Sequence, residues 1–219
     1  MIKATNGILF GDVHSFNDLN LVLVSSTIPP AKPKTTYIDI PGADGSLDLT
    51  EANGEVKYSD RECVFTFAVL PSDETDFEEK KTEISNLLNG KSCKITLDTD
   101  EDYYYQGRCS VDNHLQDGNL KQFTIKAKVR PYKYRQEVTK VIATLSGATK
   151  TVILSNGRKA VVPSIECTND NTVISFGGAT FNLSAGTHKI LDIMLAEGDN
   201  TLTVSGTGTV TFMYQEGDL

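Results

Sequence analysis

Tryptophan is absent from the 219 residues, and no apolar stretch approaches the length of a membrane span. Flat aromatic rings are the usual platform for sugar rings, so the lack of tryptophan argues against a sugar-gripping surface. The remaining aromatic residues near the C-terminus include Phe212 and Tyr214, which lie two apart and so share a strand face. That spacing favours a core position for both. A membrane helix needs roughly 20 apolar residues in a row, which excludes a spanning helix.

Cysteine and histidine are scarce, with four and three copies. The cysteines are Cys63, Cys93, Cys109 and Cys167, and the histidines are His14, His114 and His188. No Cys-x-x-Cys pair occurs, so we interpret the cysteines as small apolar side chains on strands rather than a disulfide framework. The histidines have no close His or Cys neighbour, and neither a nucleophile elbow nor a phosphate loop is present. We therefore expect no metal, no cofactor and no enzymatic activity.

Basic charge is also in short supply. The formal net charge is −8 and the isoelectric point is near 4.9. Nucleic-acid binding needs a basic surface to neutralise phosphates, and docking to anionic membranes needs a basic patch, so neither partner is expected. The N-terminal residues contain no long apolar segment of the kind found in secretion signals, and we expect synthesis and folding in a cytoplasm.

The first 134 residues read mostly as strands around one helix. Cys63–Val69 and Gln122–Val129 alternate apolar and polar residues, as half-buried strands do. The stretch from Thr75 to Asn89 has an acidic first turn and an apolar stripe of Phe77, Ile84, Leu87 and Leu88, and Gly90 suits the position after a helix. The prolines between Ser25 and Thr36 predict a loop or an exposed arm, because proline cannot donate to a sheet ladder.

Residues 135–219 differ in composition, with more Gly, Thr, Ser and Asn and no helical pattern. Short apolar segments recur between turn signals, one of them Lys189–Met194, at the spacing typical of an antiparallel sandwich. We place the domain boundary at Pro131–Arg135, giving domains 1–134 and 135–219. The expected fold class is mainly β: a β-rich first domain with one helix and a C-terminal antiparallel β-sandwich.

Two further patterns have more than one interpretation. Asp98-x-Asp100-x-Asp102 resembles the start of an EF-hand loop, but Tyr103 stands at the sixth position, where the loop needs glycine. We interpret it as a solvated hairpin turn. Arg61 and Arg108 each lie on an expected strand. Each can extend its charged end to water, or it can bridge subunits by a bidentate contact with a carboxylate. The sequence leaves both readings open.

Tyr37–Glu51 has the most informative sequence, reading YIDIPGADGSLDLTE. Pro41-Gly42 and Asp44-Gly45 are turn dipeptides between two extended segments. This stretch resembles the signature region of the siphophage distal tail proteins, also called Dit. Arg61 in YSDR, the YYYQGR segment that ends at Arg108, and the RPYK segment from Arg130 resemble the same family in the expected order.

The resemblance implies a structural component of the virion at the phage tail tip. It implies that the first domain forms a hexameric ring, which joins the tail tube protein to the tail-associated hub protein and the receptor-binding apparatus. It also implies that the C-terminal sandwich is like a galectin or a carbohydrate-binding module. Candidate subunit contacts are Pro41, Gly42, Asp44, Gly45, Arg61 and Arg108. The alternative function is a carbohydrate-binding adhesion module for host wall polysaccharide, and a third is a wall hydrolase, which would need a paired-carboxylate or metal site.

The charge distribution adds one expectation to that implied ring. Residues 1–134 hold 15 basic and 21 acidic groups, a charge of −6, whereas residues 135–219 hold 6 and 8, a charge of −2. A ring through which DNA passes avoids retaining it if acidic groups face the axis. The turn with Asp98, Asp100, Glu101 and Asp102 is the candidate for that position.

Overall fold

The computed structural model describes residues 6–52, 54–69, 77–117 and 120–219. By its internal contacts the chain divides into two compact units, residues 1–133 together with Leu219, and residues 134–218. The division lies one residue before the boundary expected from the sequence. Whether either part folds alone stays a prediction.

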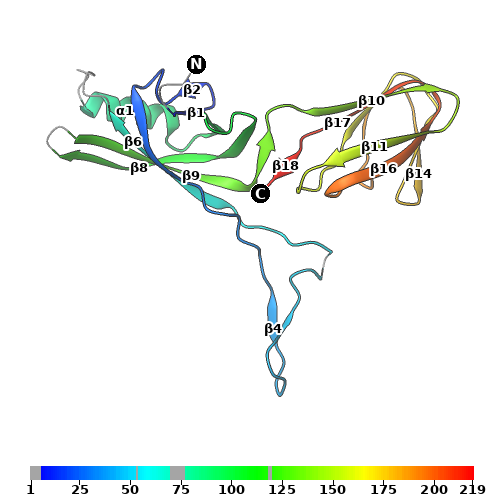
Figure 1. Cartoon of the computed structure of the whole chain (residues 1–219), viewed down its shortest axis with the longest axis horizontal. Coiled ribbons are helices and arrows are strands. Elements are labelled where there is room, and N and C mark those ends of the chain that lie inside the picture. Colours follow the sequence, from blue (N-terminus) through cyan, green and yellow to red (C-terminus); the bar gives the residue numbers. More distant parts are fainter. Residues whose placement is uncertain (1–5, 53, 70–76, 118–119) are drawn as a thin grey trace. The chain divides into compact units, whose positions relative to one another are not determined.

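The first unit is built on one antiparallel sheet in the order β2-β1-β7-β8-β9-β6-β3, with β18 also paired to β9 (Figure 1). Its strands are β1 (Ile8–Phe10), β2 (Val13–His14), β3 (Leu21–Thr27), β6 (Arg61–Val69), β7 (Ser92–Leu97), β8 (Tyr103–Asp117) and β9 (Leu120–Arg135). The residues of β18 (Gly217–Asp218) belong to the second unit. The two strands predicted from their alternation are thus β6 and β9, and they pair with each other.

The register between β6 and β9 explains why one sheet face is buried. Phe65 lies opposite Ile125 and Phe67 opposite Phe123, and all four side chains are fully buried. The intervening residues of both strands, such as Glu62 opposite Lys128, point to the other face. Because side chains alternate along a strand, this register gives the sheet one apolar and one polar face.

The helix α1 (Phe77–Leu88) covers the apolar face. Phe77, Ile84 and Leu88 are buried in the same core as the sheet, and Leu87 packs partly against it, which confirms the predicted stripe. Gly90 has φ of 77°, the left-handed conformation expected after the last helical turn. Thr75, the expected N-terminal cap, lies outside the described residues.

Residues 134–218 form two four-stranded antiparallel sheets with a shared core. One sheet has the order β10 (Thr139–Ser146), β17 (Thr207–Tyr214), β12 (Ser164–Cys167), β15 (Gly186–Lys189). The other has the order β11 (Lys150–Asn156), β16 (Gly198–Ser205), β13 (Thr172–Phe176), β14 (Ala179–Leu183). Fully buried side chains from both sheets, among them Phe212 and Leu154, meet in one cluster. The likeness to galectins stays a prediction.

One expected strand in this unit is wrong. Lys189–Met194 is not a strand, because β15 ends at Lys189 and the chain then turns, with the N–H of Ile193 donating to the carbonyl of Ile190 at 3.1 Å. Ile193 and Leu195 are both fully buried. The alternation of apolar residues here arises because two side chains are buried in the core. It does not indicate that the backbone pairs with a neighbouring strand.

The two remaining strands of the first unit form a hairpin that is separate from the main sheet. β4 (Tyr37–Asp39) and β5 (Ser46–Asp48) pair only with each other in a two-stranded sheet. The predicted turns between them are present, with φ of 84° at Gly42 and 75° at Gly45. We call residues 32–52 and 54–59 the arm. In Figure 1 it is the hairpin that carries the β4 label.

Candidate functional site

The arm holds four of the six candidate contact residues. Pro41, Gly42, Asp44 and Gly45 form its tip, and every residue from 32 to 48 is exposed. Four apolar side chains of the arm are about half exposed: Tyr37 at 59%, and Ile38, Ile40 and Leu47 at 48% each. An isolated two-stranded hairpin is marginally stable in water at best. An arm of this composition is therefore suited to packing against another surface.

Internal hydrogen bonds nevertheless shape the arm. At its base, the N–H of Lys34 donates to the carbonyl of Lys57 at 2.7 Å. Further out, the N–H of Leu49 donates to the carbonyl of Thr36 at 2.8 Å. Hydrogen bonds from Thr50 lower the pKa of the Asp48 carboxyl group. The arm is thus a defined hairpin that presents its tip.

Arg61, the fifth candidate, lies in the interior with a side chain that is only 5% exposed. Its guanidinium stacks over the ring of Tyr105, 5.1 Å from the centroid. One nitrogen, Nη1, is 3.5 Å from the carbonyl of Pro29 at the root of the arm, while Nε and Nη2 have no partner in the described part of the chain. The side chain does not extend to water, and its role in a subunit contact stays a prediction.

We expect Arg61→Met to raise the free energy of unfolding, by about 1 kcal/mol or more. The substitution removes two buried donors without partners, which each cost about 1–3 kcal/mol, and a cation–π contact worth about 0.5–2 kcal/mol. Methionine keeps most of the packing volume. Denaturant unfolding would measure the change, with Arg108→Met as the exposed control. A loss of about 3 kcal/mol or more would show that the buried guanidinium is well paired.

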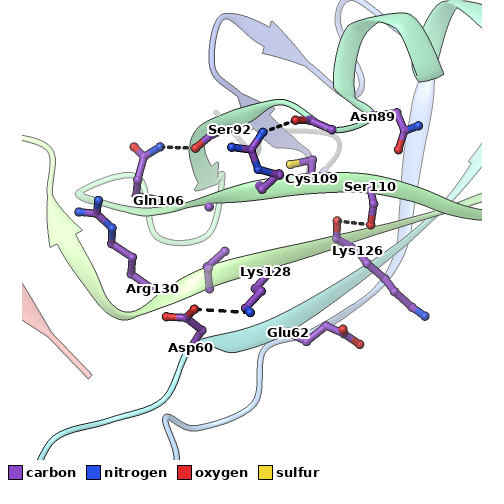
Figure 2. Close-up of a pocket in the computed structure, with 14 residues that line it drawn as sticks. Asp60, Glu62, Asn89, Ser92, Gln106, Cys109, Ser110, Lys126, Lys128 and Arg130 are labelled. Carbon is purple, nitrogen blue, oxygen red and sulfur yellow. Dashed lines mark hydrogen bonds and ion pairs between the residues drawn. The ribbon is translucent and has the colours of Figure 1, made fainter.

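Arg108, the sixth candidate, lines a groove on the polar face of the sheet (Figure 2). The groove has a volume of about 670 Å³. We call it the basic groove. Its lining residues are Asp60, Glu62, Asn89, Gly90, Ser92, Gln106, Gly107, Arg108, Cys109, Ser110, Lys126, Lys128, Val129 and Arg130.

Strands β8 and β9 lie close together beneath the basic groove because residue 107 is a glycine. A β-carbon on this residue would lie 2.7 Å from the α-carbon of Val129 and would also collide with the carbonyl oxygen of Lys128. The alternation of β8 places residue 107 on the buried face with Tyr105 and Cys109, and places the exposed Arg108 on the face that carries the groove.

Four cations and two carboxylates line the basic groove, so its charge is positive although the chain is acidic. Lys128 is 3.9 Å from the Asp60 carboxylate. Lys126 is paired at 2.9 Å with Asp112, whose hydrogen bond raises the pKa of that lysine. Arg108 donates to the carbonyl of Gly90, and the side chain of Arg130 makes no hydrogen bond or ion pair with any described residue. Both arginines therefore lack a carboxylate partner within the described chain.

Sequence reasoning found only part of this groove. Arg108 and Arg130 were noted for their resemblance to family segments, and Lys126 and Lys128 as the outward residues of a strand. The alternation indicated that the lysines share a face. The turn sequence from Gln116 to Asn119 indicated that the segments on either side of it are neighbours, as β8 and β9 are. The sequence did not show that a groove forms beside Arg108.

Two of the cysteines meet below the basic groove. The sulfur atoms of Cys93 and Cys109 are 3.6 Å apart on the neighbouring strands β7 and β8. Their hydrogen bond lowers the pKa of Cys93 and, together with burial, raises the pKa of Cys109. All four cysteines are free thiols in the structure. The interpretation that the cysteines serve as apolar strand residues, without a disulfide framework, stays a prediction.

The acidic turn is a solvated hairpin turn only in part. Asp98 accepts a hydrogen bond from the N–H of Gly7 at 2.8 Å and lies 3.2 Å from Nε2 of His14. Asp100 pairs with Lys133 at 2.8 Å. Replacing all four acids with lysine would break these contacts, so a test of the channel is confined to Asp102, which is exposed.

The described residues contain no group of three or more His, Cys, Asp or Glu side chains placed to hold a metal ion. Within the same residues, no helix has the length and apolar character required to cross a membrane.

Comparison with known proteins gives a family and a fold. Residues 11–130, more than half of the chain, match the family described as the phage tail protein RIFT-related domain. Among solved structures, the crystal structure of the Dit protein (gp 19.1) of SPP1 aligns with a TM-score of 0.71 and 14% sequence identity, over 98% of this chain and 100% of that chain. That protein is described as a paradigm of the hub adsorption apparatus in phages that infect Gram-positive hosts. A search of curated proteins found no match. The predicted resemblance to siphophage distal tail proteins is confirmed, and the chain belongs to the siphophage tail-protein family with the RIFT-related domain.

Proposed function

We propose that six copies of this chain form a closed ring at the tip of a siphophage tail. The ring joins the tail tube protein to the tail-associated hub protein and, through the hub, to the receptor-binding apparatus. The family match supports a structural role in the tail, and the fold is shared with a protein described as part of a hub adsorption apparatus. The chain would be made in the host cytoplasm and reside in the virion.

The observation that carries the ring proposal is the exposed apolar arm. Burial of Tyr37, Ile38, Ile40 and Leu47 against a second surface would be favoured by about 25 cal/mol for each Å² removed from water. The described core of the first unit contains none of the arm's residues, although Tyr58 at its base contacts the ring of Tyr132 with a centroid distance of 6.0 Å. A neighbouring subunit in a ring is a surface that can cover it.

Ring closure needs a head-to-tail interface, in which one patch of each subunit meets a different patch of the next. An arm that projects from one side of a subunit satisfies the first half of this requirement. Pro41, Gly42, Asp44 and Gly45 at its tip are then contact residues, whereas Arg61 acts from the interior by supporting the root of the arm at Pro29.

The structure gives the C-terminal unit no observation in favour of sugar binding. Phe212 and Tyr214 are buried in its core, as their spacing predicted, so neither can act as a platform. The adhesion-module alternative stays a prediction.

Light scattering coupled to size exclusion tests the ring. We expect a particle of six times 23.9 kDa, either for the protein alone or after addition of the tube or hub protein. A strict monomer in every mixture would contradict the proposal. A particle of the right mass that fails to bind either partner would leave the ring intact but contradict its place at the tail tip.

A further inference from the structure

We infer that the basic groove is the receptor for the arm of the neighbouring copy of this chain. The inference rests on the proposed ring and names the second patch of its head-to-tail interface. It follows from charge, from exposure and from the shapes of the two surfaces.

The arm is uniformly acidic over its outer part. Between Lys34 and Lys57 the sequence contains Asp39, Asp44, Asp48, Glu51 and Glu55, and no lysine or arginine. The side-chain carboxylates of Asp44, at the tip, and Glu51, on the second strand side of the arm, form no hydrogen bond or ion pair with a described residue. Their carboxylates are available to a partner.

The basic groove contains positive charges that lack carboxylate partners. Arg108 and Arg130 are exposed and lack carboxylate partners among the described residues, whereas Lys126 is already paired with Asp112. Asp60 and Glu62 also line the groove, so the four cations leave it with a net charge of +2. A guanidinium fork binds a carboxylate through two parallel hydrogen bonds, and both arginines are free to do so.

The shapes of the two surfaces also agree. The tip residues Gly42, Ala43, Asp44 and Gly45 have small side chains, and the groove that would receive them is lined by Arg108, Lys128 and Arg130 of strands β8 and β9. Figure 2 shows Lys128 and Arg130 among these lining side chains. The groove volume of about 670 Å³ is in the range of sites that accept several residues or a small ligand.

A second copy is a better occupant than nucleic acid. The groove contains two carboxylates, and the chain as a whole carries a charge of −8, which repels phosphates at longer range. Unlike nucleic acid, which carries a long row of phosphates, the acidic arm brings only a few negative charges to the groove. Neighbouring subunits are both acidic and repel each other, so their association is favoured where a negative patch of one meets a positive patch of the next.

Zero-length carbodiimide coupling of the assembled wild-type ring tests the contact directly. The ring is assembled from equal amounts of ¹⁴N- and ¹⁵N-labelled protein, so mixed-isotope peptides identify links between subunits. We expect such a link between an acid of residues 44–51 and Lys128 or Lys126. A ring that yields links only between other surfaces would overturn the docking and leave the ring proposal standing.

Charge exchange provides an independent test on the same ring. We expect the double variant Arg108→Glu with Arg130→Glu to raise the concentration for half assembly by at least about tenfold, since each charge-assisted pair contributes more than 1 kcal/mol. Asp44→Lys with Glu51→Lys should have a similar effect. Combining all four substitutions should restore assembly in part, because the charges are again opposite. The matched control is Lys140→Glu with Lys150→Glu, which makes the same charge change at exposed sites in the second unit.

The outcomes separate the two proposals. Unchanged assembly in both double variants overturns the docking alone, and a strictly monomeric wild-type protein overturns the ring and the docking together. Binding of duplex DNA by wild-type protein at low salt, lost in the groove variant while assembly persists, would assign the groove to nucleic acid and overturn the docking. If the groove variant does not fold, the arm variant and the wild-type cross-links still decide.

Discussion

Removing the arm is expected to abolish ring assembly while leaving the subunit folded. In this variant an Asn-Gly turn joins Lys34 to Lys57, which already pair through a hydrogen bond of 2.7 Å. A two-residue turn of this type closes an antiparallel pair without strain. The deleted residues contribute none of the side chains buried in the core, so the melting temperature should move by only a few degrees.

The loss of assembly should be complete rather than partial, because the deletion removes the exposed apolar residues and the five carboxylates together. Size exclusion with light scattering gives the particle mass, and circular dichroism confirms the fold. A variant that replaces Tyr37, Ile38 and Ile40 with serine keeps the charges and separates the apolar contribution. An armless protein that still assembles into rings would contradict the proposed contact.

Truncating one buried phenylalanine in each unit is expected to destabilise that unit only. Phe123→Ala removes a fully buried ring that contacts Phe77 at a centroid distance of 5.0 Å, and Phe212→Ala does the same in the second core. Such changes cost about 3–5 kcal/mol. In a domain of roughly 100 residues, each kcal/mol lowers the melting temperature by about 4–8 °C.

Differential scanning calorimetry of both variants distinguishes independent units from a single cooperative one. Two independent units predict that Phe123→Ala lowers one transition by more than about 10 °C and leaves the other in place, with the reverse for Phe212→Ala. A single transition that both variants lower equally would contradict the division at residues 133 and 134. If the two units are independent, fragment 134–219 is preferred to 135–219 for expression, because Tyr134 is buried and belongs to the second unit.

Much of the fold was predictable because local patterns determine it. The alternation in β6 and β9 predicted which side chains are buried, and the stripe on α1 predicted its buried face. The prolines near Pro29–Pro33 and the two turn dipeptides predicted an exposed arm with tight turns. These features depend on neighbouring residues, and the sequence displays them directly.

The basic groove was not predictable, because it depends on which strands become neighbours. The turn sequence from Gln116 to Asn119 indicated that the strands of Arg108 and Arg130 are neighbours. The groove also needs β6 beside β9, and no local pattern indicated that pairing. The burial of Arg61 was equally hidden. An arginine at the start of a strand is ordinarily exposed, and here the root of the arm and Tyr105 enclose it.

Electron micrographs of the negatively stained protein, alone and mixed with its tail-tube partner, test the central claim most directly. The account predicts class averages with six-fold rotational symmetry around an open centre for the wild-type protein, and single small particles for the armless variant. Wild-type averages without rotational symmetry in either sample would contradict the ring.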